Sequence, residues 1–150
     1  MVNWEREDSV EFMLSLGADP NVIDSRYGTT PIFHAAFRGK KKISQLLISR
    51  GADVNARSND GRTALHFIGG APEVFALLIS KGADIDARDD DGNTPLHHTA
   101  MSGDTIVAQL LISVSADLSI KNNKGQTALE LAEERDSRGV IWLLEHSCHE

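Results

Sequence analysis

The sequence predicts an all-α repeat solenoid of about four and a half helix-turn-helix repeats joined by hairpin tips. One motif recurs through the chain: "GTTPIFHAA" begins at Gly28, "GRTALHFIG" at Gly61, "GNTPLHHTA" at Gly92 and "GQTALELAE" at Gly125. These starts are 33, 31 and 33 residues apart. A second series keeps the same phase, with "LGADPN", "RGADVN", "KGADID" and "VSADLS". A period of this length indicates stacked copies of one supersecondary structure.

The first helix of each repeat is expected to follow a threonine whose hydroxyl can cap unpaired backbone N–H groups. These threonines are Thr30, Thr63, Thr94 and Thr127. Pro31 and Pro95 come next, at the first helical position, where a missing N–H costs nothing. Gly39 and Gly103 are expected to end this helix.

The second helix of each repeat carries apolar residues at i, i+3 and i+4, the pattern of a buried helix face. The four stripes are Ile43-Leu46-Leu47, Val74-Leu77-Leu78, Val107-Leu110-Leu111 and Val140-Leu143-Leu144. Gly17, Gly51 and Gly82 are expected to end this helix. Polar segments such as "ARSNDG" and "ARDDDG" then lead to the next threonine.

The motif T-P-L-H-x-A, the period near 33 residues and the G-A-D-x-N exit resemble the ankyrin repeat over residues 9 to 145. The resemblance implies antiparallel helix pairs stacked side by side, with β-hairpin tips projecting at about a right angle. It also implies a single ankyrin-repeat domain over residues 1–150. Its expected repeats are 1–24 (partial), 25–57, 58–88, 89–121 and 122–150, the last a C-terminal cap.

Two adjacent histidines, His97 and His98, raise the question of a catalytic or metal site. The resemblance places His66 and His97 at a position where the ring bonds the threonine and neighbouring backbone. The same position holds Phe33 in one repeat and Glu130 in another, which a catalytic role could not tolerate. We therefore predict a structural role for His97. For His98 we predict a place along the groove wall, in a structural role, as a partner contact or as a ligand.

Composition narrows the classes of partner. The net charge of −7 disfavours nucleic acid, and Arg38-Gly-Lys40-Lys41-Lys42 is expected to be a solvated helix start. No apolar stretch is long enough to span a membrane, and the first residues lack the apolar region of a signal peptide. We expect a cytoplasmic or nuclear protein, although a signal peptide removed ahead of Met1 would leave the same sequence. The segment "HSCH" at 146–149 has no second cluster to complete a zinc site, so we expect no metal and no cofactor.

Departures from the repeat are places where specificity could reside. The third repeat is two residues short at Gly69-Gly70. This is either a tolerated deletion or a notch in the concave wall, flanked by Phe37-Arg38 and Met101-Ser102, with Phe67 on its floor. Gly69-Gly70 is expected to end the first helix about half a turn early, and Pro72 fits the start of the next helix.

Two further departures lie near the ends of the chain. The first repeat lacks its first helix, so either Trp4 caps an apolar flank or the chain was cut from a longer array. Trp142 occupies an outward helix position, either packed under residues 146–150 or exposed as an interface anchor.

Outside the positions of the repeat motif, the sequence contains no set of residues that could act as nucleophile, base and orienting group. It also contains no phosphate-binding loop, so we predict no enzymatic activity.

The resemblance implies binding of another protein on the concave face and hairpin tips. Arg, Tyr, Phe and Met favour interfaces, which places the expected contact centre near the N-terminal half. Thr29 and Arg62 are further variable tip positions. The predicted partner-binding residues are Arg26, Tyr27, Phe37, Arg38, Arg57, Asn59, Asp60, Phe67, Arg88, Asp90, Asp91, Met101, Ser102 and Lys124.

The function predicted first is a non-enzymatic protein-protein interaction module, acting as an adaptor, regulator or inhibitor. The alternative is a targeting or inhibitory subunit bound constitutively to a catalytic protein. A designed scaffold is disfavoured by irregularities such as Phe33 and Ser115. We expect a monomer in the absence of the partner, and no binding of nucleic acid or membrane.

Overall fold

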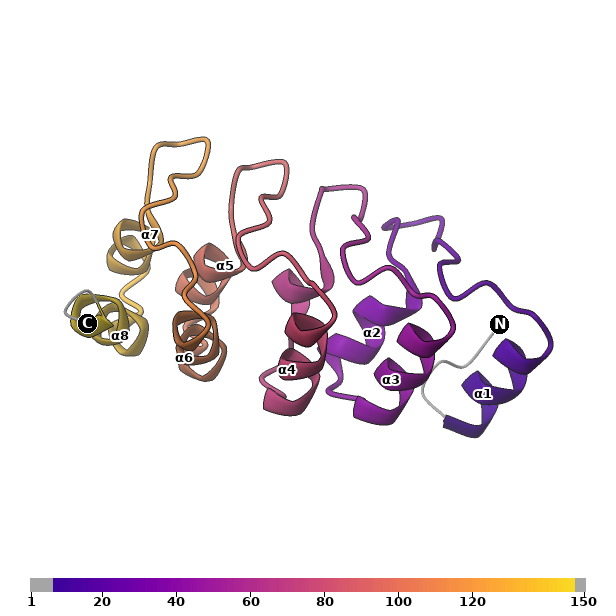
Figure 1. The fold of residues 1–150 in the computed structure, drawn as a ribbon. Helices are drawn as coiled ribbons and strands as arrows, with labels where there is room; N and C mark the ends of the chain where they lie inside the picture. Colours follow the sequence, from indigo (N-terminus) through magenta and orange to yellow (C-terminus); the bar gives the residue numbers. More distant parts are fainter. Residues whose placement is uncertain (1–6, 148–150) are drawn as a thin grey trace. The chain divides into compact units, whose positions relative to one another are not determined.

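The fold is a series of short antiparallel helix pairs connected by hydrogen-bonded turns. The structure, a computed structural model, describes residues 7–147 (Figure 1). Within that range it contains eight α-helices, one 3₁₀ helix and no β-strand. This confirms the predicted all-helical repeat architecture. The chain divides into two compact units, Met1–Ala83 (the N-terminal unit) and Asp84–Glu150 (the C-terminal unit), each described here by itself.

The N-terminal unit contains two rows of helices. Its elements are α1 (Glu7–Ser15), α2 (Pro31–Phe37), α3 (Lys41–Ser49), the 3₁₀ helix η1 (Ala64–Phe67) and α4 (Pro72–Ser80). First helices pack side by side, α2 against η1, and α3 packs between α1 and α4 (Figure 1). As predicted, α2 begins at Pro31 and α4 at Pro72.

The C-terminal unit repeats this plan with regular helices. Its elements are α5 (Pro95–Ser102), α6 (Thr105–Ser113), α7 (Ala128–Glu134) and α8 (Arg138–Ser147). Helix α5 packs against α7, and α6 packs against α8. Gly103 ends α5 in the left-handed conformation, with φ of 74°, as its position predicted.

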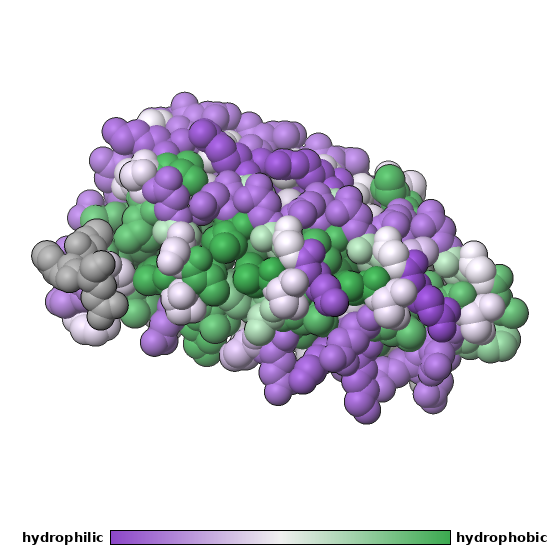
Figure 2. Space-filling model, viewed as in Figure 1, coloured by the Kyte–Doolittle hydropathy of each residue, from purple (hydrophilic) through white to green (hydrophobic). Residues whose placement is uncertain are grey.

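The core is the apolar stripe of the second helices. Its i and i+4 positions are at most 3% exposed, whereas the i+3 leucines lie at the edge of the stripe, partly exposed. The buried pairs are Ile43 and Leu47, Val74 and Leu78, Val107 and Leu111, and Val140 and Leu144. Because each helix pair is too small to bury this face alone, neighbouring pairs cover it for one another. Polar residues gather instead on the hairpin tips, seen along the top of Figure 2.

Each hairpin tip is a tight turn closed by a backbone N–H···O=C hydrogen bond of 2.9 Å. The bonded pairs are Asp24 and Thr29, Ser58 and Arg62, Asp89 and Asn93, and Asn122 and Gln126. The predicted hairpins are therefore turns rather than paired strands across residues 7–147. Neighbouring tips within a unit are also joined, since the Asn59 N–H donates to the Tyr27 carbonyl at 2.9 Å.

The short third repeat departs from its prediction. Its first helix is a single 3₁₀ turn, η1, rather than an α-helix shortened by half a turn. The Gly69 N–H donates to the Ala36 carbonyl at 3.3 Å, and a Cβ on Gly69 would overlap the carbonyl oxygen of Phe37. The deletion therefore brings two backbone segments into contact at the end of α2. Met101 and Ser102 belong to the C-terminal unit, so the notch between the two walls stays a prediction.

Candidate functional site

An open groove of about 620 Å³ lies on the N-terminal unit, between two hairpin tips and the first helices. We call it the aromatic groove. Its lining residues are Arg26, Tyr27, Thr29, Phe33, His34, Phe37, Ser58, Asn59, Asp60, Arg62 and Phe67. A volume of this size lies within the range of protein binding pockets, about 300–1,000 Å³.

Four aromatic rings, those of Tyr27, Phe33, Phe37 and Phe67, line the groove. Tyr27 and Phe37 are exposed, at 57% and 63%, whereas Phe33 is buried. The Phe33 and Phe67 ring centroids lie 5.6 Å apart at a tilted angle, which is a favourable aromatic pairing. The groove therefore has the paired Phe33 and Phe67 rings on its floor and the exposed Tyr27 and Phe37 rings at its rims.

Two arginines stack on the aromatic rings. The Arg26 guanidinium carbon lies 5.0 Å from the Tyr27 ring centroid, and that of Arg62 lies 5.6 Å from the Phe67 ring centroid. Guanidinium groups at such distances are attracted to the ring faces. The arrangement places positive charge beside apolar surface.

The Asp24 carboxylate holds the first tip in shape. It accepts hydrogen bonds from the Arg26 and Tyr27 N–H groups, each at 2.9 Å, and from the Thr29 hydroxyl at 3.2 Å. The backbone N–H of Arg26, followed by that of Tyr27, holds the pKa of Asp24 below its ordinary value. Asp24 is therefore ionised at neutral pH, and it positions Tyr27 at the rim.

Gly28 allows the second tip to approach the first. It has φ of 68°, and a Cβ there would overlap the Asn59 side chain and backbone nitrogen. On that second tip, the Arg62 Nε lies 3.1 Å from the Asp60 Oδ2, and the Ser58 hydroxyl donates to the same carboxylate. The single carboxylate of the lining, Asp60, is thus engaged by its own tip.

Six of the predicted partner-binding residues line the aromatic groove: Arg26, Tyr27, Phe37, Asn59, Asp60 and Phe67. Arg38 and Arg57 lie outside the lining, and the Arg57 Nη1 donates to the Gly61 carbonyl at 3.0 Å. Sequence reasoning missed Phe33, His34 and Ser58. Phe33 carried a usable signal, because it replaces the histidine of the repeat motif.

The C-terminal unit has a smaller groove of about 200 Å³, which we call the polar groove. It is lined by Asp91, Asn93, Met101, Asn122, Asn123, Lys124, Gln126, Leu131, Glu134 and Arg135, of which Asp91, Met101 and Lys124 were predicted.

The other predicted residues of the C-terminal unit, Arg88, Asp90 and Ser102, lie outside the lining of the polar groove. The Arg88 Nη2 donates to the Lys121 carbonyl, and the Asn123 side chain donates to the Asp90 carbonyl, each at 2.9 Å. These bonds join the two tips of the C-terminal unit.

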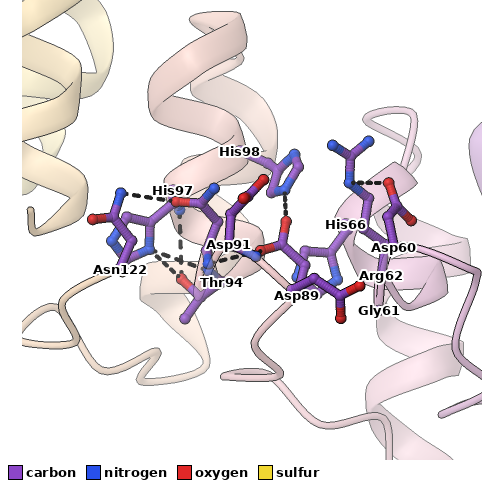
Figure 3. Close-up of polar contacts among 12 residues, drawn as sticks. Asp60, Gly61, Arg62, His66, Asp89, Asp91, Thr94, His97, His98 and Asn122 are labelled. Atoms are coloured by element: carbon purple, nitrogen blue, oxygen red, sulfur yellow. Dashed lines mark hydrogen bonds and ion pairs between the residues drawn. The ribbon is translucent and has the colours of Figure 1, made fainter. Parts of the chain in front are cut away.

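His97 is part of the scaffold (Figure 3). Its Nδ1 accepts the Thr94 N–H at 3.2 Å, and its Nε2 lies 2.9 Å from the Gln126 carbonyl oxygen. Since a backbone N–H only donates and a carbonyl only accepts, the ring is neutral with its proton on Nε2. Burial lowers the pKa of His97 below its ordinary value, which favours this neutral form. Both ring nitrogens are occupied, so His97 is not available as a general base.

His98 is held by the tip of its own unit. Its Nε2 lies 2.8 Å from the Asp89 Oδ2 (Figure 3), and the buried Asp89 carboxylate also accepts the N–H groups of Asp91 and Asn93. His98 is partly buried but lies outside the lining of the polar groove. These contacts support the structural interpretation of His98.

Trp142 is 59% exposed, and its ring stacks on that of His146 with centroids 4.5 Å apart. Because residues 148–150 lie outside the described range, the choice between an exposed Trp142 and one packed under residues 146–150 stays a prediction. The predictions about Trp4 and about Cys148 and His149 fall outside the described residues. Among residues 7–147, no helix is both long and apolar enough to cross a membrane.

Known proteins share the repeat. The chain is 36% identical over 69 residues to the B-cell lymphoma 3 protein homolog of Mus musculus, covering 46% of this chain and 15% of that protein. It is 42% identical over 60 residues to the SH3 and multiple ankyrin repeat domains protein 1 of Homo sapiens (39% and 3%). It is 39% identical over 54 residues to the 2-5A-dependent ribonuclease of Mus musculus (36% and 7%).

The chain thus spans less than a sixth of the length of each of these relatives. A family model of ankyrin repeats in three copies matches residues 1–89 and again residues 68–150. Members of that family generally act in protein–protein interaction rather than catalysis. The match extends over the whole sequence and agrees with the helix pairs, the capping residues and the turns described above, so the chain belongs to the ankyrin repeat family.

Proposed function

We propose that this chain is a non-enzymatic protein-binding module whose contact centre is the aromatic groove. The observation that carries the proposal is the exposure of Tyr27 and Phe37 beside arginine on a fixed tip. Tyr and Arg are among the residues that dominate binding energy at protein interfaces. Bonds from Asp24 and Asn59 hold this tip, so little conformational entropy is lost when a partner binds.

The predicted tip and helix residues around the groove and on the C-terminal unit complete the proposed contact set. A standard interface buries about 800 Å² and about 20–30 residues on each partner, more than one groove supplies. In this proposal the chain acts as an adaptor, regulator or inhibitor. The large size of its relatives is consistent with a recognition part of a longer protein.

The test is affinity capture from a lysate of the native source, followed by mass spectrometry. The test variant carries alanine at Arg26, Tyr27, Phe37 and Arg38, and the matched control carries alanine at the exposed residues Phe12, Arg50, Ile106 and Arg138, which lie outside both grooves. We expect the test variant to lose partners that the wild type and the control retain. Circular dichroism would check that both variants stay folded. Undiminished capture by the test variant would exclude the aromatic groove as the contact centre.

A second candidate is a targeting or inhibitory subunit bound constitutively to a catalytic protein. The observation that favours it is the similarity to a protein named as a ribonuclease. It predicts co-purification at fixed stoichiometry, which size-exclusion chromatography with light scattering would measure. A chain that elutes alone from the native source would contradict this candidate.

A further inference from the structure

The aromatic groove lies in a positively charged segment of an acidic chain. Between Asp24 and Phe67 the sequence has eight Arg or Lys residues and three Asp, a net charge of +5. Residues 1–23 have a net charge of −4 and residues 68–150 a net charge of −8, within the total of −7. The segment that contributes this groove therefore has a net charge opposite in sign to that of the rest of the chain.

Positive charges also outnumber negative charges among the side chains that line the groove. Arg26 and Arg62 contribute two positive charges, and Asp60 contributes the one carboxylate. Asp60 already accepts the Ser58 hydroxyl and pairs with Arg62. Within residues 7–147, the Arg26 side chain stacks on Tyr27 and forms no ion pair with a carboxylate. Arg26 is therefore placed to pair with an incoming negative charge.

The apolar part of the groove points to a second requirement on the ligand. The exposed faces of Tyr27 and Phe37 lie beside Phe67, next to the arginines. Burying an apolar side chain among such rings removes their exposed surface from water. Because the groove is open to solvent and bounded by two tips, a chain can pass through it, which an enclosed pocket would prevent.

We propose that the aromatic groove binds an acidic linear segment of a partner protein. A bulky apolar side chain of that segment lies between Tyr27, Phe37 and Phe67, and Asp or Glu residues flank it, with one of their carboxylates paired with Arg26. This inference rests on the proposed function, and it adds the chemistry of the partner. Charge complementarity of this kind speeds association and selects against basic partners.

The experiment is selection of a phage-displayed library of random linear peptides on the full chain. We expect selected peptides to carry Asp or Glu on both sides of a Leu, Ile, Phe or Trp residue. The strongest peptide would then be synthesised with a fluorophore, and its affinity measured by fluorescence anisotropy. Because rim charges are screened by ions, its affinity should fall as salt is raised.

Variants inside and outside the aromatic groove separate this site from the rest of the surface. We expect Phe37→Ala and Arg26→Glu each to weaken the selected peptide by about tenfold or more, as loss of an interface anchor does. Phe12→Ala and Arg138→Glu make the same two changes at exposed residues outside both grooves, and they should leave the affinity unchanged. A peptide whose acidic residues are replaced by lysine should lose binding.

Several results would overturn the inference: selection of basic or uncharged peptides, an affinity unaffected by Arg26→Glu, or equally tight binding of a single-stranded oligonucleotide. Lysate capture separates this failure from that of the proposed function. If the alanine variant at Arg26, Tyr27, Phe37 and Arg38 loses partners but no acidic peptide is selected, the partner chemistry is wrong and the binding role stands. If capture is unchanged, the binding role itself is wrong.

Discussion

One pair of equivalent positions differs between a repeat of the N-terminal unit, with Thr30 and Phe33, and a repeat of the C-terminal unit, with Thr94 and His97. In the C-terminal unit, the Thr94 hydroxyl lies 2.9 Å from the His97 Nδ1, and its backbone N–H donates to the same nitrogen. In the N-terminal unit, the Thr30 hydroxyl is buried and has no hydrogen-bond partner within residues 7–147. Phe33 packs against Phe67 instead. The residue at this position thus either forms a hydrogen bond with the capping threonine, as His97 does, or contributes an aromatic ring to the groove, as Phe33 does.

The first helices of the repeats also differ in length between the two units. Helix α5 runs a full eight residues, Pro95–Ser102, whereas η1 is a single turn of four, Ala64–Phe67. The regular unit has the polar groove of about 200 Å³, and the irregular unit has the aromatic groove of about 620 Å³. The comparison teaches that repeat residues hold this scaffold together, while departures from the repeat expose surface that can bind.

The largest expected effect is on the shortened repeat. A Cβ on Gly69 would overlap the Phe37 carbonyl oxygen, which is backbone and cannot rotate away. We expect Gly69→Ala to lower the free energy of unfolding by about 3 kcal/mol, as overpacking does. Urea denaturation of the full chain would measure this.

The matched control for Gly69→Ala is Gly125→Ala in the C-terminal unit. Gly125 has φ of 77° and nothing within 4 Å of a Cβ, so only backbone strain of about 1 kcal/mol is expected. Equal costs for the two substitutions would show that the contact between Gly69 and Phe37 is not tight.

A smaller effect on stability is expected when the hydroxyl of Thr94 or Thr30 is removed, and it should differ between the two. Thr94→Val removes a hydroxyl that is bonded within the cap, so we expect a loss of about 1–2 kcal/mol. Thr30→Val removes a buried hydroxyl without a described partner, so we expect a change within about 0.5 kcal/mol or a gain, since the polar group no longer has to be desolvated. Thermal unfolding of both variants would compare them. A loss at Thr30 as large as that at Thr94 would contradict the difference between the units.

The smallest expected effect is a pH dependence from His97. Its pKa in the folded chain is lowered by burial, whereas in the unfolded chain it has the ordinary value near 6.5. Between these values the unfolded chain binds a proton that the folded chain does not, so stability rises with pH and is lost as pH falls below about 6.5. Protonation would also put an N–H opposite the Thr94 N–H.

Urea denaturation at about pH 7.5 and about pH 5.5, on either side of the ordinary histidine pKa, would measure this dependence. The control is His97→Gln, which removes the titrating ring. We expect the variant to be less stable than the wild type but to lose less stability on acidification. If wild type and variant lose the same amount, His97 does not titrate as the geometry requires.

The helices could be predicted from the sequence because their signals are local. Pro31, Pro72 and Pro95 begin helices where expected, and Gly103 ends one, since these residues act on their own backbone. The roles of His66 and His97 were predicted through the resemblance to the ankyrin repeat. In the structure each ring accepts the backbone N–H of a threonine three residues earlier.

The aromatic groove was only partly predictable. Residue type alone pointed to Tyr27 and Phe37. Phe33, His34 and Ser58 were missed because the packing of two repeats decides which side chains border the opening between them. The stacking of Arg62 on Phe67 and the bond between the Ser58 hydroxyl and Asp60 depend on side-chain conformation, which repeat spacing does not specify.

The sequence by itself determined the repeat, the helix starts and the buried stripe, because each follows from periodicity and from residues within one turn of each other. Only the tertiary structure decided that η1 would be a single turn and that an apolar groove would remain open beside it. Those outcomes depend on distant segments meeting, as Gly69 meets Phe37 and Asn59 meets Tyr27. Burial and backbone contact between separate repeats are properties of the packed chain, and no local pattern contains them.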